Sequence, residues 1–150
     1  MLPATSLKSR LHNGNVRASV LCAFKNNGKI LISEGYDPVK NETFHRLLGG
    51  GIEFGERSDI ALKREITEEL GAEIEGLRYL GTIENIFTWE GKEGHEILLI
   101  YNAKFADEKI YNSHLLEVLD RNDAKVYWKK ITDFTENKDI LYPPGLLELL

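Results

Sequence analysis

One stretch of this chain, Ser58–Leu70, has the spacing of an amphipathic helix, whereas the segments on both sides of it have the composition of strands. Three apolar residues recur every four positions and would form a stripe on one helix face: Leu62, Ile66 and Leu70. We expect Ser58 to cap the first turn and Gly71 to end the helix in the left-handed conformation that glycine tolerates. One strong helix between strand segments predicts a layered domain of the α/β or α+β class.

The flanking segments predict strands that alternate with turns. Strands are expected at residues 16–24, 29–33, 77–87, 95–105 and 125–129, which are rich in β-branched and aromatic residues. The polar segment 34–43 is expected to be a loop, and Pro143-Pro144 is expected to open a short helix that ends the chain. A length of 150 residues suits a single domain, 1–150.

Composition excludes several classes of protein. The chain has no run of about 20 apolar residues, so it predicts no membrane span. Cys22 is the only cysteine, which excludes an internal disulfide and a zinc site built from cysteines. The first ten residues lack the apolar core and cleavage site of a secretory signal, so we expect a soluble, cytoplasmic protein.

The negative charge of the chain is concentrated in one short segment. Residues 53–75 hold eight acidic and three basic side chains, so this segment accounts for the whole formal net charge of −5. The remainder is balanced and offers no broad basic surface for nucleic acid. Acidic residues concentrated in one segment of a chain that is otherwise neutral indicate a multivalent cation as partner.

Three glutamates of this segment, Glu65, Glu68 and Glu69, fall on one arc of the predicted helix, beside the apolar stripe. Like charges at these spacings each cost about 0.2–0.5 kcal/mol in an isolated helix. Their position near the helix C-terminus also opposes the macrodipole. A divalent cation held by oxygen ligands would remove both penalties. The alternative is an ordinary solvated acidic face.

The residues around the glutamates favour the cation. Gly49-Gly50-Gly51 is expected to be a flexible turn whose backbone can approach phosphate oxygens or offer a carbonyl to a metal. Glu56 precedes the helix, where its carboxylate can join the turn to the helix start. Arg64 adjoins the acidic arc, where it can orient Glu68 or contact a substrate phosphate.

Residues 50–72 resemble the Nudix (MutT-like) box: glycine, five residues, glutamate, seven residues, then Arg-Glu-apolar-any-Glu-Glu-any-Gly-apolar. Gly50, Glu56 and the run Arg64 to Ala72 fill every fixed position. Leu48 departs from the proline that many members have before the paired glycines. The resemblance covers roughly residues 16–150 and implies the Nudix fold, an α/β/α sandwich with a mixed sheet and the box as a loop–helix–loop.

The resemblance also implies an activity, the hydrolysis of a nucleoside diphosphate linked to another group X, with Mg²⁺ or Mn²⁺ as cofactor. It implies that the metal is held by the carbonyl of Gly50 and by the carboxylates of Glu65, Glu68 and Glu69. Glu65 and Glu68, with Arg64, are also expected to be catalytic, and Glu65 can instead orient or deprotonate the attacking water. The general base varies across the family, and the candidates outside the box are Glu96, Glu93, Glu117 and Asp123.

Substrate contacts are expected from residues near the box and on the later strands. Arg46, Gly49 and Gly51 are candidates for the phosphates, and His95 is a candidate because it lies beside Glu96 on a predicted strand. Three aromatic residues can stack on a base, although packing in the core is their commoner role: Phe54, Phe87 and Trp89.

Alternative functions stay open at this point. A non-catalytic nucleotide sensor on a Nudix fold would not need three mutually repelling carboxylates, and an RNA 5′-end pyrophosphohydrolase would need a basic surface. For the group X, ADP-ribose, oxidised nucleoside triphosphates, dinucleoside polyphosphates and nucleotide sugars all fit the chemistry. The expected partner is a small nucleotide, with no membrane or nucleic acid, and a homodimer stays open because many members form dimers.

Overall fold

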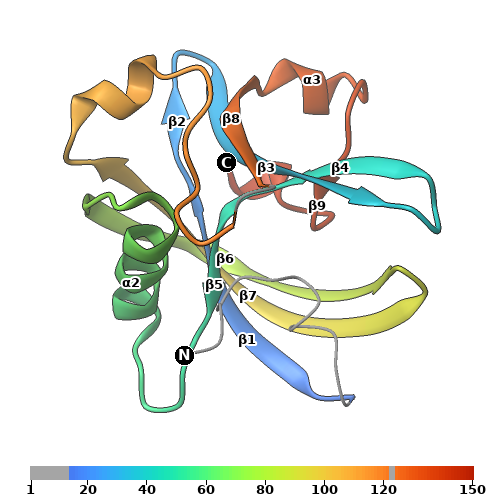
Figure 1. The fold of residues 1–150 in the computed structure, drawn as a ribbon. Helices are drawn as coiled ribbons and strands as arrows, with labels where there is room; N and C mark the ends of the chain where they lie inside the picture. Colours follow the sequence, from blue (N-terminus) through green and yellow to red (C-terminus); the bar gives the residue numbers. More distant parts are fainter. Residues whose placement is uncertain (1–13, 122–123) are drawn as a thin grey trace.

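The computed structural model describes residues 14–121 and 124–150, and this part of the chain forms two sheets and one long helix (Figure 1). The first sheet has the strand order β5-β1-β7-β6. It is mixed, because β1 runs parallel to β7 and antiparallel to β5. Its strands are β1 (Val16–Ala23), β5 (Leu48–Gly51), β6 (Ile74–Trp89) and β7 (Lys92–Phe105). The α+β class predicted from the sequence is confirmed.

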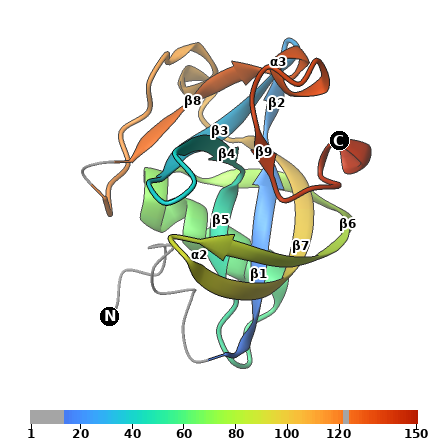
Figure 2. The same cartoon turned by 90° about the vertical axis from the view of Figure 1, so that its right-hand side faces the viewer.

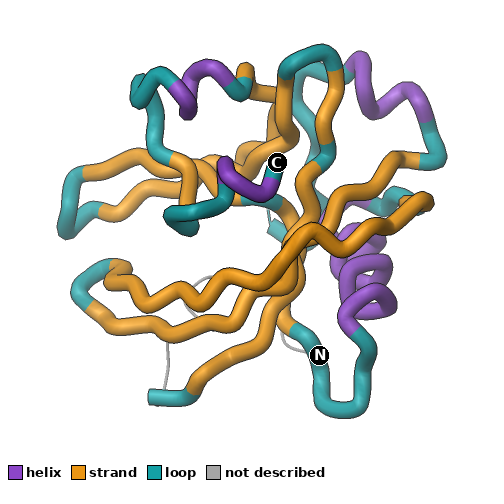
Figure 3. The backbone as a smooth tube through the Cα atoms, turned by 180° about the vertical axis from the view of Figure 1, so that it is seen from behind, coloured by secondary structure: helices purple, strands orange, loops and turns teal. Residues whose placement is uncertain are grey.

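The second sheet has the order β2-β3-β4-β9, with β8 paired to the other side of β3. Its strands are β2 (Lys25–Asn26), β3 (Lys29–Asp37), β4 (Glu42–Arg46), β8 (Lys125–Lys130) and β9 (Leu141–Tyr142). Short helical turns lie at η1 (Glu108–Asn112), α3 (Thr132–Thr135) and η2 (Leu147–Leu149). Figure 3, a view from behind, shows more of the described chain as strand than as helix, and α2 (Ser58–Leu70) as its one long helix.

The long helix α2 (Ser58–Leu70) covers one face of the first sheet (Figure 2). Leu62 and Ile66 are fully buried in one hydrophobic cluster with Val20 of β1 and Leu48 of β5. Gly71 ends the helix with φ 64°, as its sequence position predicts.

The expectation that Ser58 caps this helix is wrong. Arg57 occupies the N-cap position with an extended backbone and no side-chain hydrogen bond, and Ser58 is already the first helical residue. The Ser58 hydroxyl is 2.6 Å from the hydroxyl of Tyr101 in β7. The serine therefore ties the helix to the sheet instead of satisfying the helix N-terminus.

The other face of the first sheet packs against a second hydrophobic cluster, in which Leu21 and Ile100 meet Phe134 of α3 and Leu146 near the chain end. The short helix expected to open at Pro143-Pro144 forms only in part, as the single 3-10 turn η2 (Leu147–Leu149), which begins four residues after Pro143. Gly145 has φ 89°, a left-handed conformation that interrupts a helix. No helix among the described residues is long and apolar enough to cross a membrane.

Two segments expected to be loops are largely strand. β3 continues to Asp37 and β4 begins at Glu42, so only residues 38–41 turn where 34–43 was expected to be a loop. Gly49-Gly50-Gly51 belongs to β5 and pairs with β1. A Cβ at Gly49 would overlap the carbonyl oxygen of Val20, so the glycine permits two strands to approach closely where a flexible turn was expected.

Candidate active site

Arg64 joins three parts of the box through its guanidinium group. Its Nε and Nη2 donate to the two carboxylate oxygens of Glu56, each at 2.8 Å, and Nη2 also donates to the carbonyl of Gly51 at 2.9 Å. Its Nη1 donates to Glu65 at 2.9 Å. Hydrogen bonding to Glu56 is the main reason that the pKa of Arg64 is raised, and the same bonds lower the pKa of Glu56. Arg64 therefore holds β5 and the loop after it against α2.

The three glutamates lie on the packed side of α2 and not in open solvent. Glu65 is 0% exposed and Glu69 is 5% exposed, while Glu68 is half-buried. A Cβ at Gly50 would collide with the carboxylate of Glu65, so the backbone of Gly50 lies directly against that carboxylate. The structure thus brings the Gly50 backbone and the Glu65 side chain together, as the box resemblance implies.

The donor chemistry at this place suits a hard divalent cation, because carboxylates and a backbone carbonyl supply only oxygen. In the residues described, no three His, Cys, Asp or Glu side chains are gathered closely enough to hold an ion as they stand. Arg64 Nη1 lies 2.9 Å from Glu65 Oε1 and 3.4 Å from either oxygen of Glu68. The guanidinium therefore offsets part of the repulsion between the glutamates that a bound metal ion was expected to remove.

A cavity of about 340 Å³ opens between the β3–β4 hairpin and the β6–β7 hairpin, which extend to the same side of the molecule in Figure 1. Aromatic rings form much of its wall, and they come from β4, β6 and β9: Phe44, Phe87, Trp89 and Tyr142. Arg46 and Asn85 contribute polar groups. Of the predicted substrate residues, Arg46, Phe87 and Trp89 line this cavity.

Asp37 and Lys40 tie the two hairpins together beside the cavity. Asp37 is 1% exposed, and its carboxylate accepts from Val39 and Lys40 N–H in its own hairpin and from Glu90 N–H, at 3.1 Å, in the other. Lys40 Nζ donates to the carbonyl of Thr88 at 2.7 Å. Burial tends to raise the pKa of Asp37, but the three backbone donors outweigh it and lower that pKa.

Sequence reasoning missed three acidic or phenolic residues of this cavity. Tyr142 donates a hydrogen bond of 2.7 Å to Glu42 across the β4–β9 pair, and burial together with Glu42 raises the pKa of Tyr142 to about 12. Asp37 had a usable signal, because an aspartate before Pro38 in a polar segment is typical of a turn whose side chain bonds backbone N–H groups. Glu42 and Tyr142 lie 100 residues apart and carried no such signal.

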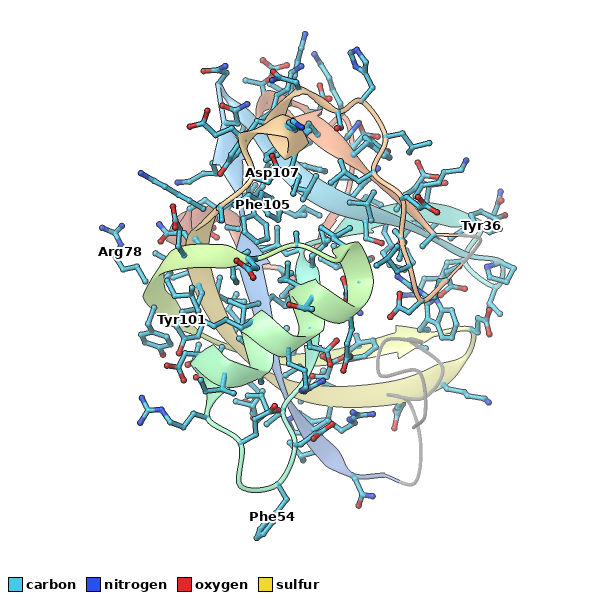
Figure 4. The ribbon with its side chains drawn as sticks, turned by 60° about the vertical axis from the view of Figure 1, so that its left-hand side comes forward. Tyr36, Phe54, Arg78, Tyr101, Phe105 and Asp107 are labelled. Carbon is cyan, nitrogen blue, oxygen red and sulfur yellow. The ribbon has the colours of Figure 1, made fainter. Side chains whose placement is uncertain are left out.

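Other predicted residues lie away from the cavity. Phe54 is fully exposed and projects from the tip of the loop that precedes α2 (Figure 4). His95 lies next along β7 to the buried Glu96, and its ring is 3.1 Å from exposed Glu84. Gly49 and Gly51 lie buried within β5. Their roles toward substrate stay predictions.

Of the candidates for the general base, Glu96 is fully buried and paired with Arg46, with Oε2 3.6 Å from Nη2. Glu93 and Glu117 are exposed. Asp123 lies outside the described residues.

Comparison with known proteins gives one family and one group of structures. A family model described as the NUDIX domain matches residues 15–142. A crystal structure of a MutT NUDIX hydrolase from Burkholderia pseudomallei is 24% identical with a TM-score of 0.60, covering 79% of this chain and 85% of that one. The solution structure of the E. coli ORF135 protein is 20% identical, also with a TM-score of 0.60, covering 97% and 90%. A NUDIX hydrolase from Nitrosomonas europaea is 15% identical with a TM-score of 0.59, covering 90% and 86%. At these sequence identities the similarity to the solved structures shows the fold and nothing further.

Proposed function

The chain belongs to the Nudix family and is a Nudix pyrophosphohydrolase, and on that premise we propose that it cleaves a nucleoside diphosphate linked to another group, with the help of a divalent metal ion. The observation that carries the proposal is the buried arrangement of the box. Glu65 and Glu69 are withdrawn from solvent on one side of α2, and Glu65 lies against the backbone of Gly50. Buried carboxylates are expensive unless they are paired or hold a cation.

The proposed metal ligands are the carbonyl of Gly50 and the carboxylates of Glu65, Glu68 and Glu69, with Mg²⁺ or Mn²⁺ as the ion. A bound ion would polarise a phosphoryl oxygen and lower the pKa of a coordinated water. Arg64 contributes by fixing the loop and Glu65 in place through its bonds to Glu56, Gly51 and Glu65. With these contacts made, Arg64 acts here by holding the site together.

The proposed place for the nucleoside is the cavity between the hairpins. Its volume of about 340 Å³ is of the size that binds small molecules, and its aromatic walls suit a planar base. Arg46 leads through Leu47 into β5, which carries Gly50, so the cavity is connected to the box by a few residues of chain. A small soluble nucleotide with its base in the cavity fits this connection.

A substrate panel tests the proposal. ADP-ribose, oxidised nucleoside triphosphates, dinucleoside polyphosphates, nucleotide sugars and a 5′-triphosphorylated RNA are each incubated with Mg²⁺, with Mn²⁺ and with a chelator, and released phosphate or nucleotide is measured. We expect metal-dependent turnover of at least one small nucleotide. Turnover that survives chelation would contradict the metal, and no turnover of any compound would favour the sensor.

The variant Glu69→Gln tests the ligand set. We expect it to lose turnover and to keep its far-ultraviolet circular dichroism and melting transition. Glu73→Gln is the matched control, since Glu73 is an exposed glutamate just after the helix. Full activity of the Glu69→Gln variant would remove Glu69 from the ligand set.

A further inference from the structure

Glu96 is an unusual residue for the interior of a sheet. It lies in β7 at 0% exposure, and within the described part of the chain neither of its carboxylate oxygens accepts a hydrogen bond. Arg46 Nη2 lies 3.6 Å from Glu96 Oε2, which is an ion-pair contact longer than a hydrogen bond. Because Arg46 is the last residue of β4, the pair connects the two sheets.

The pair lies directly behind the cavity. The Arg46 side chain is 14% exposed and lines the cavity. Asn85 stands opposite Glu96 in the β6–β7 register and also lines the cavity. On the other side of Glu96, β1 places Arg17 opposite it, and a Cβ at Gly51 would come within 2.8 Å of an Arg17 guanidinium nitrogen. Glu96 therefore stands in a row of polar residues that runs from the cavity toward β5.

Packing does not explain this arrangement. Taking two charges out of water costs more than a long ion pair returns, and replacing a buried pair by apolar residues of similar size is often neutral or stabilising. A position that only had to fill the space between two sheets would be served by leucine or methionine. An energetically unfavourable buried charge pair at the wall of a cavity is instead typical of a binding site.

We propose that Glu96 is a positioning residue, which holds the Arg46 guanidinium at the cavity wall so that its N–H groups bind the phosphate attached to the nucleoside. A guanidinium fork matches phosphate oxygens, and Arg46 lies between the aromatic cavity and the strand that carries Gly50. In a nucleotide, the phosphate next to the nucleoside occupies that same intermediate place. The inference rests on the proposed function in taking the ligand to be a nucleotide.

The role assigned to Glu96 is indirect. Its carboxylate has no exposed surface, and Arg46 is the member of the pair that reaches the cavity. Without the counter-charge, the guanidinium loses its ion-pair contact with β7, and more of its ordering is left to the moment when the ligand binds. Glu96 thus acts on phosphate through Arg46 and on the uncharged nucleoside not at all.

Calorimetric binding without metal, in the presence of a chelator, tests this role. The wild-type protein is titrated separately with AMP, GMP, CMP, UMP and each of their parent nucleosides. The monophosphate that binds most tightly, together with its nucleoside, is then used to compare the variants. Glu96→Gln is expected to weaken the binding of that monophosphate about tenfold, which corresponds to the loss of roughly one charge-assisted hydrogen bond from Arg46 to the phosphate. The affinity for the nucleoside is expected to stay unchanged. In an Arg46→Met background the same substitution is expected to have no further effect, because the two residues act as one unit.

Controls separate positioning from a general loss of structure. Glu75→Gln, at an exposed site on β6, is expected to bind like the wild type. If Glu96→Gln folds poorly, Arg46→Met combined with Glu96→Met takes its place. Removing the whole pair is expected to keep the stability of the wild type and to lose the tighter binding of monophosphate over nucleoside. Equal weakening of monophosphate and nucleoside, an effect that persists beside Arg46→Met, or tighter monophosphate binding would overturn the proposal, as would a wild type that binds none of the four. Because binding is measured without turnover, absence of hydrolysis in the substrate panel leaves this test intact.

Discussion

Alanine at Gly50 isolates the contact between the backbone of β5 and Glu65. Gly50 lies in β5 and its φ is outside the left-handed region, so alanine can adopt the backbone without strain. The added Cβ would instead overlap the Glu65 carboxylate, which must move. That carboxylate also accepts the 2.9 Å bond from Arg64, so its displacement disturbs the centre of the box.

The expected effect on stability follows from overpacking a buried site. Forcing one extra methyl group into a packed interior costs about 1–3 kcal/mol. In a domain of this size each kcal/mol shifts the melting temperature by about 2–4 °C, so Gly50→Ala is expected to melt roughly 2–12 °C below the wild type. The rate of hydrolysis should fall by more than the loss of folded protein explains, because Glu65 is a proposed metal ligand.

A double variant identifies the atoms that collide. Calorimetric melting is compared for the wild type, Gly50→Ala, Glu65→Ala and the combination. We expect the double variant to have the same melting temperature as Glu65→Ala, since that truncation removes the overlapping carboxylate. Gly81→Ala is the matched control, because its Cβ would meet only the end of the Leu149 side chain, at 3.0 Å. If Gly50→Ala destabilises equally with and without the Glu65 carboxylate, the clash lies elsewhere and the reasoning fails.

Two further predictions concern the loop before α2. Arg64 lowers the pKa of Glu56, so the folded state binds this proton less readily than the unfolded chain, and the stabilisation is present at neutral pH and lost as pH falls from 4.5 downward. Urea unfolding should therefore show Glu56→Gln about 1.5–3 kcal/mol less stable than the wild type at pH 7, with a smaller difference at pH 3. A difference that stays constant with pH would contradict this. Phe54→Ala, at a fully exposed site outside the cavity lining, should change the unfolding free energy by less than about 0.5 kcal/mol and leave KM unaltered. A raised KM would instead support Phe54 as a substrate contact.

The box was predictable because its information is local. The apolar spacing and Gly71 predicted the helix with its observed bounds, and Glu56 was expected to join the turn to the helix start. Its partner in that role, Arg64, lies only eight positions further on but was expected to contact Glu68 or a phosphate instead. Ser58 shows where a local rule fails. A serine at a helix start is typical of a cap, but here its partner is Tyr101, which is 43 residues away in the sequence and invisible to that rule.

The cavity was not predictable, because it is made by tertiary contacts. Its walls come from β4, β6 and β9, and no spacing in the sequence announces that Glu42 and Tyr142 meet. The glycines of β5 were misread for a similar reason. Three successive glycines suggest freedom when viewed alone, and only the partner strand shows that Gly49 is required for close approach to Val20.

The bonds of Asp37 and Lys40 have a consequence for ligand entry. They link the tips of two hairpins from different sheets through Glu90 N–H and the Thr88 carbonyl, so the mouth of the cavity is shaped before any ligand arrives. When a ligand enters a cavity whose entrance is already ordered, little of the binding free energy is spent on ordering the protein. Recognition by this protein should therefore be closer to lock and key than to induced fit, with association rates that vary little among guests of one shape.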